Sequence, residues 1–134
     1  MTKCFCPWRK KKVCLTPEEW VRQTFLHRLV DEFGYPTNLI AVEVPLQGKR
    51  ADAIVYTPDL HPLVLIEFKA ETVPLTQKVL DQIAVYNRQL HVPFLILHNG
   101  PQTIVAQVSD SDISYLPVIP LYRDTVIPQK SFSH

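Results

Sequence analysis

The chain has 134 residues, a formal net charge of +1 at pH 7 and a hydrophobic fraction of 46%, which together predict a single globular domain. Its longest apolar runs, such as Phe94 to Leu97, are far too short to span a bilayer. No apolar signal segment follows the positive residues at the N-terminus. We therefore expect a cytoplasmic protein with no membrane partner.

Residues 1–15 are predicted to form a basic arm. Of the 14 Lys and Arg residues, five lie among the first twelve positions without an acid between them. The rest of the chain therefore contains nine basic and 13 acidic residues and is mildly acidic. Such an arm either contacts nucleic-acid phosphates or serves as a solvated tail, and charge alone does not separate the two. The candidate phosphate contacts are Arg9, Lys10, Lys11 and Lys12.

Three cysteines, Cys4, Cys6 and Cys14, crowd the same segment. An odd number of closely spaced cysteines is unlike the disulfide framework of a small secreted domain. A zinc site would need a fourth ligand such as His27, and Cys-x-Cys is not the usual Cys-x-x-Cys spacing. Reduced thiols are the favoured interpretation.

A helix is predicted to begin at Thr16 and to end before Gly34-Tyr35-Pro36. Thr16 suits the N-cap, and Glu19 stands three residues later, as in a capping box. On a helical wheel Glu18 lies near the centre of the apolar stripe and Glu19 at its edge. Glu18 is therefore the candidate site residue and Glu19 the cap, unless both only complement the positive helix N-terminus.

The following segments predict an α/β domain over residues 16–115 with the order α-β-β-β-α-β-β and a mixed sheet of about four to five strands flanked by helices. The first three strands form an antiparallel meander, and Asn99-Gly100 makes a turn before the last strand. Residues 116–134 form an extended tail that packs on the body or on a neighbour. The expected elements are strands 39–46, 52–56 and 63–69, a helix over 74–90 capped by Thr76, and strands 94–97 and 103–108.

Two strands of this meander carry the residues with the clearest chemistry. Side chains alternate along a strand, so Glu67 and Lys69 project to one side, and Asp52 reaches that side if its strand pairs with theirs. Two carboxylates and one ammonium at the end of an apolar sheet suit a divalent metal with a positioned lysine. Asp52, Glu67 and the backbone carbonyl of Phe68 would hold Mg²⁺, and the arrangement favours phosphodiester hydrolysis.

The sequence as a whole resembles the PD-(D/E)xK nuclease superfamily. After the Glu67-x-Lys69 strand, Gln82-x-x-x-Tyr86 is similar to the Gln-x-x-x-Tyr element of RecB-like nucleases and of type I restriction enzyme R subunits. The narrower resemblance is to the family described as type I restriction enzyme R protein N-terminal domain. It rests on 16–23, 49–52, 67–70 and Asn99-Gly100.

This resemblance implies a restriction-endonuclease-like core and a Mg²⁺- or Mn²⁺-dependent DNA endonuclease. Asp52 and Glu67 would be the metal ligands, Lys69 the catalytic lysine and Gln82 its support. Glu18 or Glu19 would match the acid of the first helix and Tyr86 a phenol on the DNA side. Ala51 stands where the superfamily has its naming proline.

The implied partners are DNA and other restriction or DNA-processing subunits, with a homodimer as the alternative assembly. Two other interpretations of the residues remain open. The first is a catalytically inactive nucleic-acid-binding or assembly module that keeps the nuclease fold. The second is a small α/β domain in which the acids and Lys69 form a surface ion-pair cluster.

Overall fold

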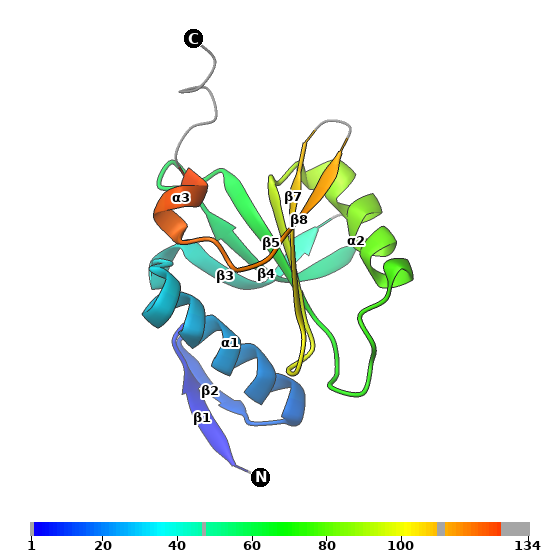
Figure 1. Ribbon diagram of the computed structural model, residues 1–134. Helices are drawn as coiled ribbons and strands as arrows, with labels where there is room; N and C mark the ends of the chain where they lie inside the picture. Colours follow the sequence, from blue (N-terminus) through cyan, green and yellow to red (C-terminus); the bar gives the residue numbers. More distant parts are fainter. Residues whose placement is uncertain (1, 47, 110–111, 127–134) are drawn as a thin grey trace.

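A six-stranded mixed sheet forms the centre of the structure, a computed structural model that describes residues 2–46, 48–109 and 112–126 (Figure 1). Its strand order is β3-β4-β5-β6-β7-β8, and only the β5–β6 pair is parallel. The sheet strands are β3 (Ile40–Leu46), β4 (Lys49–Tyr56), β5 (Pro62–Phe68), β6 (Phe94–His98), β7 (Thr103–Val108) and β8 (Ile113–Leu116). The prediction of a mixed sheet with flanking helices is therefore confirmed, while its strand number was too low.

The predicted meander corresponds to β3, β4 and β5, which pair antiparallel in sequence order. The parallel return from β5 to β6 requires a crossover, and α2 (Gln77–Leu90) supplies it. Every residue of β6 is buried, as expected for a fully apolar strand between two neighbours.

Two helices cover opposite faces of the sheet (Figure 1). The first, α1 (Pro17–Phe33), begins at Thr16, whose side chain accepts a hydrogen bond from the Glu19 N–H at 3.1 Å. It ends at Gly34, whose φ of 76° is the left-handed conformation that glycine adopts without a Cβ clash. The core on the α1 face includes Phe25, Leu26, Leu29, Val55, Ile66 and Ile96, and the core on the α2 face includes Ile54, Leu65, Ile83, Val92, Leu95 and Leu97.

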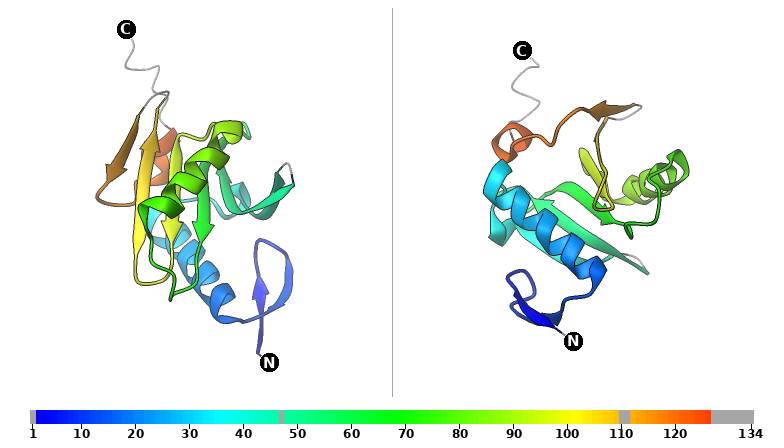
Figure 2. Two further views of the ribbon diagram at one scale, coloured as in Figure 1. Left: turned by 90° about the vertical axis from the view of Figure 1, so that its right-hand side faces the viewer. Right: turned by 60° about the horizontal axis from the view of Figure 1, so that its bottom comes forward.

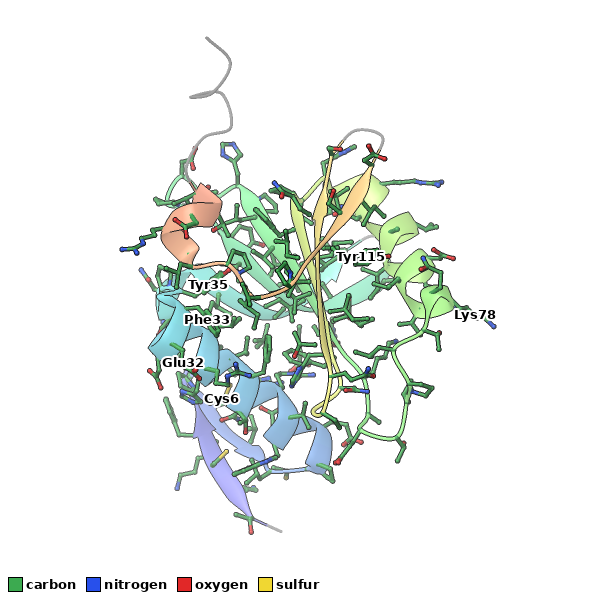
Figure 3. All side chains as sticks on the ribbon, in the orientation of Figure 1. Cys6, Glu32, Phe33, Tyr35, Lys78 and Tyr115 are labelled. Carbon is green, nitrogen blue, oxygen red and sulfur yellow. The ribbon has the colours of Figure 1, made fainter. Side chains whose placement is uncertain are left out.

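The N-terminal segment forms a β-hairpin. Strands β1 (Lys3–Cys6) and β2 (Lys11–Cys14) pair antiparallel, and the hairpin lies beside α1 in every view (Figure 2). Cys6 is 1% exposed and lies where the hairpin meets α1 (Figure 3). The described part of the predicted basic arm, residues 2–15, is therefore a hairpin that apolar and charged contacts fasten to the domain.

The C-terminal segment is also part of the domain as far as it is described. Ile119 and Tyr122 are buried in the α1-side core, and residues 122–126 form a short helix, α3 (Tyr122–Val126). The Tyr35 hydroxyl donates to the Pro120 carbonyl at 2.9 Å. Within the predicted tail, the described residues thus pack on the body of the domain, and residues 122–126 are helical rather than extended. Residues 127–134 lie outside the described part.

The Tyr122 hydroxyl gives this docking a direct test. It donates to the Tyr56 carbonyl at 2.9 Å and so ties α3 to the end of β4. We expect Tyr122→Phe to lower the free energy of unfolding by about 1 kcal/mol, because one partly buried hydrogen bond is lost. Urea denaturation measures the change. Tyr115→Phe on exposed β8 is the control, and an equal effect in both variants would contradict the docking role.

Along the described chain, none of the helices has the length and apolarity needed to cross a membrane.

Candidate functional site

Asp52 and Glu67 meet where β4 and β5 lie side by side. Ala53 pairs with Ile66, so the next residues along the two antiparallel strands are Asp52 and Glu67. The Phe68 N–H donates to Asp52 Oδ2 at 2.7 Å, which holds this carboxylate against β5. The two acids that the sequence picked out are therefore cross-strand neighbours.

The proximity of the two acids changes the titration of Glu67. Burial raises the pKa of Glu67, and the neighbouring Asp52 carboxylate raises it further by hydrogen bonding and charge repulsion, to about 8. The positive charge of Lys69 acts in the opposite direction, which shows that the ammonium is within electrostatic reach. Asp52, Glu67 and Lys69 thus form one electrostatic group, the carboxylate pair and its lysine.

Backbone contacts with β6 position Lys69. Its N–H donates to the His98 carbonyl at 2.9 Å, extending the parallel β5–β6 pairing in which Phe68 is opposite His98. The His98 ring lies 4.2 Å from the Phe25 ring of α1. Burial lowers the pKa of His98 to about 4, with a further contribution from the charge of Arg28. His98 is therefore a neutral packing residue near the site at neutral pH.

Asn99 fixes the loop that follows Lys69. This residue is 3% exposed. Its side-chain amide donates to the Val73 carbonyl at 2.9 Å and accepts from the Gln102 N–H at 2.8 Å. The sequence marked Asn99 as a turn residue and as part of the family resemblance, and its contact across 26 positions to Val73 had no local signal.

The first-helix acid that faces the sheet is Glu19. Glu18 is exposed, whereas Glu19 is 7% exposed and accepts from the Gln23 side chain at 2.7 Å. The choice of Glu18 on the helical wheel is therefore wrong. Gln23 is also buried and accepts a hydrogen bond from the Cys4 thiol of the hairpin, so the buried face of α1 includes Glu19 and Gln23.

A network of arginines and acids connects Glu19 with the carboxylate pair. Arg9 of the hairpin lies 2.8 Å from Glu19 and also forms a short ion pair with Glu43 of β3. Arg22 of α1 lies 3.4 Å from Glu19, 3.6 Å from Glu43 and 3.9 Å from Asp52. Arg22 and Glu43 were missed as site residues. The three-residue spacing of Glu19 and Arg22 on a helix was the one local signal.

Arg9 has a different environment from its basic neighbours. Its guanidinium is mostly buried and is occupied by two carboxylates, so the prediction that Arg9 contacts phosphates is corrected. Burial opposes ionisation of Glu43, but the hydrogen bond and charge of Arg9, together with the charges of Arg22 and Arg50, outweigh it, and the pKa of Glu43 lies below its usual value. Lys10, Lys11 and Lys12 are exposed and remain candidate phosphate contacts.

The structure does not bring Gln82 into the group. Gln82 is exposed on α2, and among the described side chains no hydrogen bond joins it to Asp52, Glu67 or Lys69. Lys78 of the same helix points away from the domain (Figure 3). The Tyr86 side chain lies outside the described part. The roles assigned to Gln82 and Tyr86 remain predictions.

The donor set suits a hard divalent cation that keeps much of its water. No group of three or more Asp, Glu, His or Cys side chains arranged to hold a metal is present in the part of the chain described. Mg²⁺ needs only one or two carboxylates when water or phosphate oxygens supply the remaining ligands. The mutual repulsion of Asp52 and Glu67 is what a cation would relieve, so the two acids and the Phe68 carbonyl fit the implied metal. The three cysteines are free thiols.

Comparison with known families places this arrangement in context. Residues 17–120 match the family model described as type I restriction enzyme R protein N terminus (HSDR_N), and this span is more than half of the chain. The chain belongs to this family. The description of the family refers to the R protein of type I restriction enzymes, while the PD-(D/E)xK superfamily and the metal chemistry remain proposals for this member.

A solved structure with the same fold is described as a fragment of a putative HsdR subunit of a type I restriction enzyme from Vibrio vulnificus YJ016. The TM-score is 0.59 at 22% sequence identity, over 81% of this chain and 25% of that chain. At this identity the likeness supports the fold alone. This member of the R-protein family thus spans about a quarter of that relative. No curated protein matches the chain.

Proposed function

We propose that this chain is a Mg²⁺- or Mn²⁺-dependent DNA endonuclease domain of the PD-(D/E)xK type, which hydrolyses phosphodiester bonds. The observation that carries the proposal is the approach of Asp52 and Glu67 on adjacent strands, with Lys69 within electrostatic reach of Glu67. A raised pKa produced by burial and a like charge is characteristic of functional sites. Membership in the R-protein family supplies the restriction and DNA-processing context.

Each residue of the group has a proposed role. Asp52, Glu67 and the Phe68 carbonyl hold the cation, and the bond from the Phe68 N–H keeps Asp52 in place. When bound, the cation supplies positive charge that lowers the pKa of water and stabilises charge on phosphoryl oxygens. The Lys69 ammonium stabilises negative charge that develops at the attacking oxygen. Gln82 supports Lys69 on approach of DNA, and Glu19 replaces Glu18 as the first-helix acid.

The proposed partners follow from the family context. DNA is the substrate, and other restriction or DNA-processing subunits supply recognition, with a homodimer as the alternative. We expect the protein to act in the cytoplasm.

A cleavage assay tests the proposal. Supercoiled plasmid and single-stranded DNA are incubated with the protein in Mg²⁺, Mn²⁺ or a chelator, with Lys78→Ala as a control for the loss of one exposed positive charge. We expect cleavage that requires the metal and that Lys78→Ala retains. Failure of the wild type to cut either substrate in both metals would contradict the endonuclease proposal and favour a DNA-binding or assembly module.

The exposed lysines of the hairpin are a separate prediction. We expect replacement of Lys10, Lys11 and Lys12 by glutamine to weaken DNA binding for all sequences alike, and to lower the log-log salt slope by roughly one unit per lost phosphate contact. Because Arg9 stays in place, the hairpin remains folded. Fluorescence anisotropy at several salt concentrations provides the measurement. If affinity and slope do not change, these lysines serve solubility only.

A further inference from the structure

We propose that Arg22 of α1 binds a phosphate of the DNA substrate beside the carboxylate pair, and that Arg9 is the positioning residue that leaves it available. The inference rests on the proposed function, since it names how that site recognises its substrate. Arg22 would be a second cationic contact, distinct from Lys69. Because Arg22 lies on α1 and is not a proposed metal ligand, its binding of phosphate can be tested in the absence of metal and of cleavage.

The argument begins with the unfilled hydrogen-bonding capacity of Arg22. A guanidinium has five N–H donors in a planar fork. Within the described residues, Arg22 makes one hydrogen bond, at the long distance of 3.4 Å to Glu19, and its buried Nε has no partner. Leaving buried donors unpaired is costly, so a group in this state is suited to a ligand that supplies strong acceptors.

Glu19 and Glu43, the two acids closest to Arg22, each have another arginine at a shorter distance. Arg9 makes the short contacts with Glu19 and Glu43, whereas Arg22 lies 3.4 Å or more from the same two carboxylates. Arg50 adds a third charge at 3.2 Å from Glu43. Arg22 is therefore not the closest partner of either acid, and its guanidinium keeps N–H donors for an anion.

The location of Arg22 favours a phosphate as that anion. Its Nη2 lies 3.9 Å from Asp52 Oδ1, too far for a hydrogen bond but adjacent to the carboxylate that would hold the cation. The two side chains keep 16% and 27% of their surface exposed, so solvent reaches both. Arginine binds phosphate with two parallel N–H···O bonds, a geometry that a lone ammonium does not offer.

Backbone strain in β3 shows that the surroundings of Arg22 are held in place. Glu43 has a φ of 54° in the middle of a strand, a left-handed conformation that costs a residue with a Cβ about 1 kcal/mol or more. Its neighbours Val42 and Val44 pair with Ala53 and Ala51, so Glu43 stands across from Asp52. At this irregular position the Glu43 side chain contacts two arginines that lie outside the sheet, Arg9 of the hairpin and Arg22 of α1. The strain lies at the proposed phosphate site.

The test measures binding of a short fluorescein-labelled DNA, as duplex and as single strand, by anisotropy in EDTA over a range of salt concentrations. Arg22→Gln keeps a long polar side chain and should fold because Arg9 and Arg50 still pair with Glu19 and Glu43; thermal unfolding verifies this. We expect about tenfold weaker binding and a salt slope lower by about one unit. Arg22→Lys should keep the slope and lose several-fold in affinity because the fork is gone. Arg28→Gln is the matched control on the exposed side of α1 and should bind like the wild type.

The outcomes separate this inference from the endonuclease proposal. Unchanged affinity and slope in Arg22→Gln, or a wild type that does not bind DNA in EDTA, would overturn the role of Arg22, whatever the cleavage assay gives. If Arg22→Gln does not fold, the affinity of Arg22→Lys alone tests the inference. An affinity equal to that of the wild type in this variant would overturn the bidentate contact. Loss of binding in Arg22→Gln with no cleavage by the wild type would support the phosphate site and contradict only the nuclease activity.

Discussion

Replacement of Lys69 by alanine should remove DNA cleavage and leave DNA binding in the presence of metal largely intact. The ammonium stabilises charge that develops only during the reaction, whereas the carboxylates that hold the cation are unchanged. Loss of a single group of this kind lowers the rate by roughly 100-fold to 1,000-fold. Single-turnover plasmid nicking and anisotropy binding, on the same preparations, provide the two measurements.

The controls for Lys69 distinguish a catalytic role from a general loss of positive charge. Lys78→Ala removes an exposed lysine of α2 and should cleave like the wild type. Gln82→Ala should reduce cleavage less than Lys69→Ala, because Gln82 is proposed to act through the lysine. Cleavage that survives Lys69→Ala undiminished would show that the reacting group lies elsewhere or that the activity comes from a contaminant.

Replacement of Glu67 by glutamine should abolish divalent-cation binding without unfolding the protein. The variant loses an anionic ligand and also the repulsion between Glu67 and Asp52. Calorimetric titration with Mn²⁺ gives the affinity. Asp59→Asn, an exposed acid in the turn before β5, is the matched control and should bind the cation like the wild type. Equal Mn²⁺ affinity in Glu67→Gln and the wild type would show that the cation binds at another site.

The same variant has a predicted dependence on pH. The folded-state pKa of Glu67 is raised from 4.5 to about 8, so the folded protein holds a proton that the unfolded chain has released between these values. Stability from this group is present below pH 4.5 and is lost as the pH rises toward 8. Without metal, Glu67→Gln should therefore be more stable than the wild type at pH 8, on the order of 1–3 kcal/mol, and nearly equal to it at pH 4.

Addition of Mn²⁺ should reverse this order. A cation that binds only the folded wild type raises its melting temperature, and more so at pH 8 than at pH 6, because the ligand must lose its proton. Glu67→Gln should show no such rise. Thermal unfolding at the two pH values, with and without the metal, measures all four conditions. A wild type that is more stable than Glu67→Gln at pH 8 without metal would contradict the repulsion between the two acids.

Local rules in the sequence were sufficient for the main elements and for the approach of Asp52 and Glu67. Helix α1 begins after Thr16 and ends at Gly34 as expected, since capping depends on a few adjacent residues. Period-two alternation in β4 and β5, together with their antiparallel pairing, brought Asp52 and Glu67 side by side. The caps depend on neighbouring residues and the approach of the two acids on one hairpin, so both can be predicted from the sequence.

The first-helix acid and the roles of the basic residues depended on the tertiary structure. Glu18 and Glu19 are adjacent, and the buried one is selected by how α1 docks on the sheet and under the hairpin. Arg9 contacts Glu43 across 34 positions, and no local pattern distinguishes it from the exposed Lys10 beside it. The strand β8 and helix α3 form because the sheet offers them a partner strand and an open apolar face. Sequence by itself determined the main elements and the approach of Asp52 to Glu67, whereas long-range packing decided which charges are buried together, because desolvation and ion pairing depend on residues far apart in the chain.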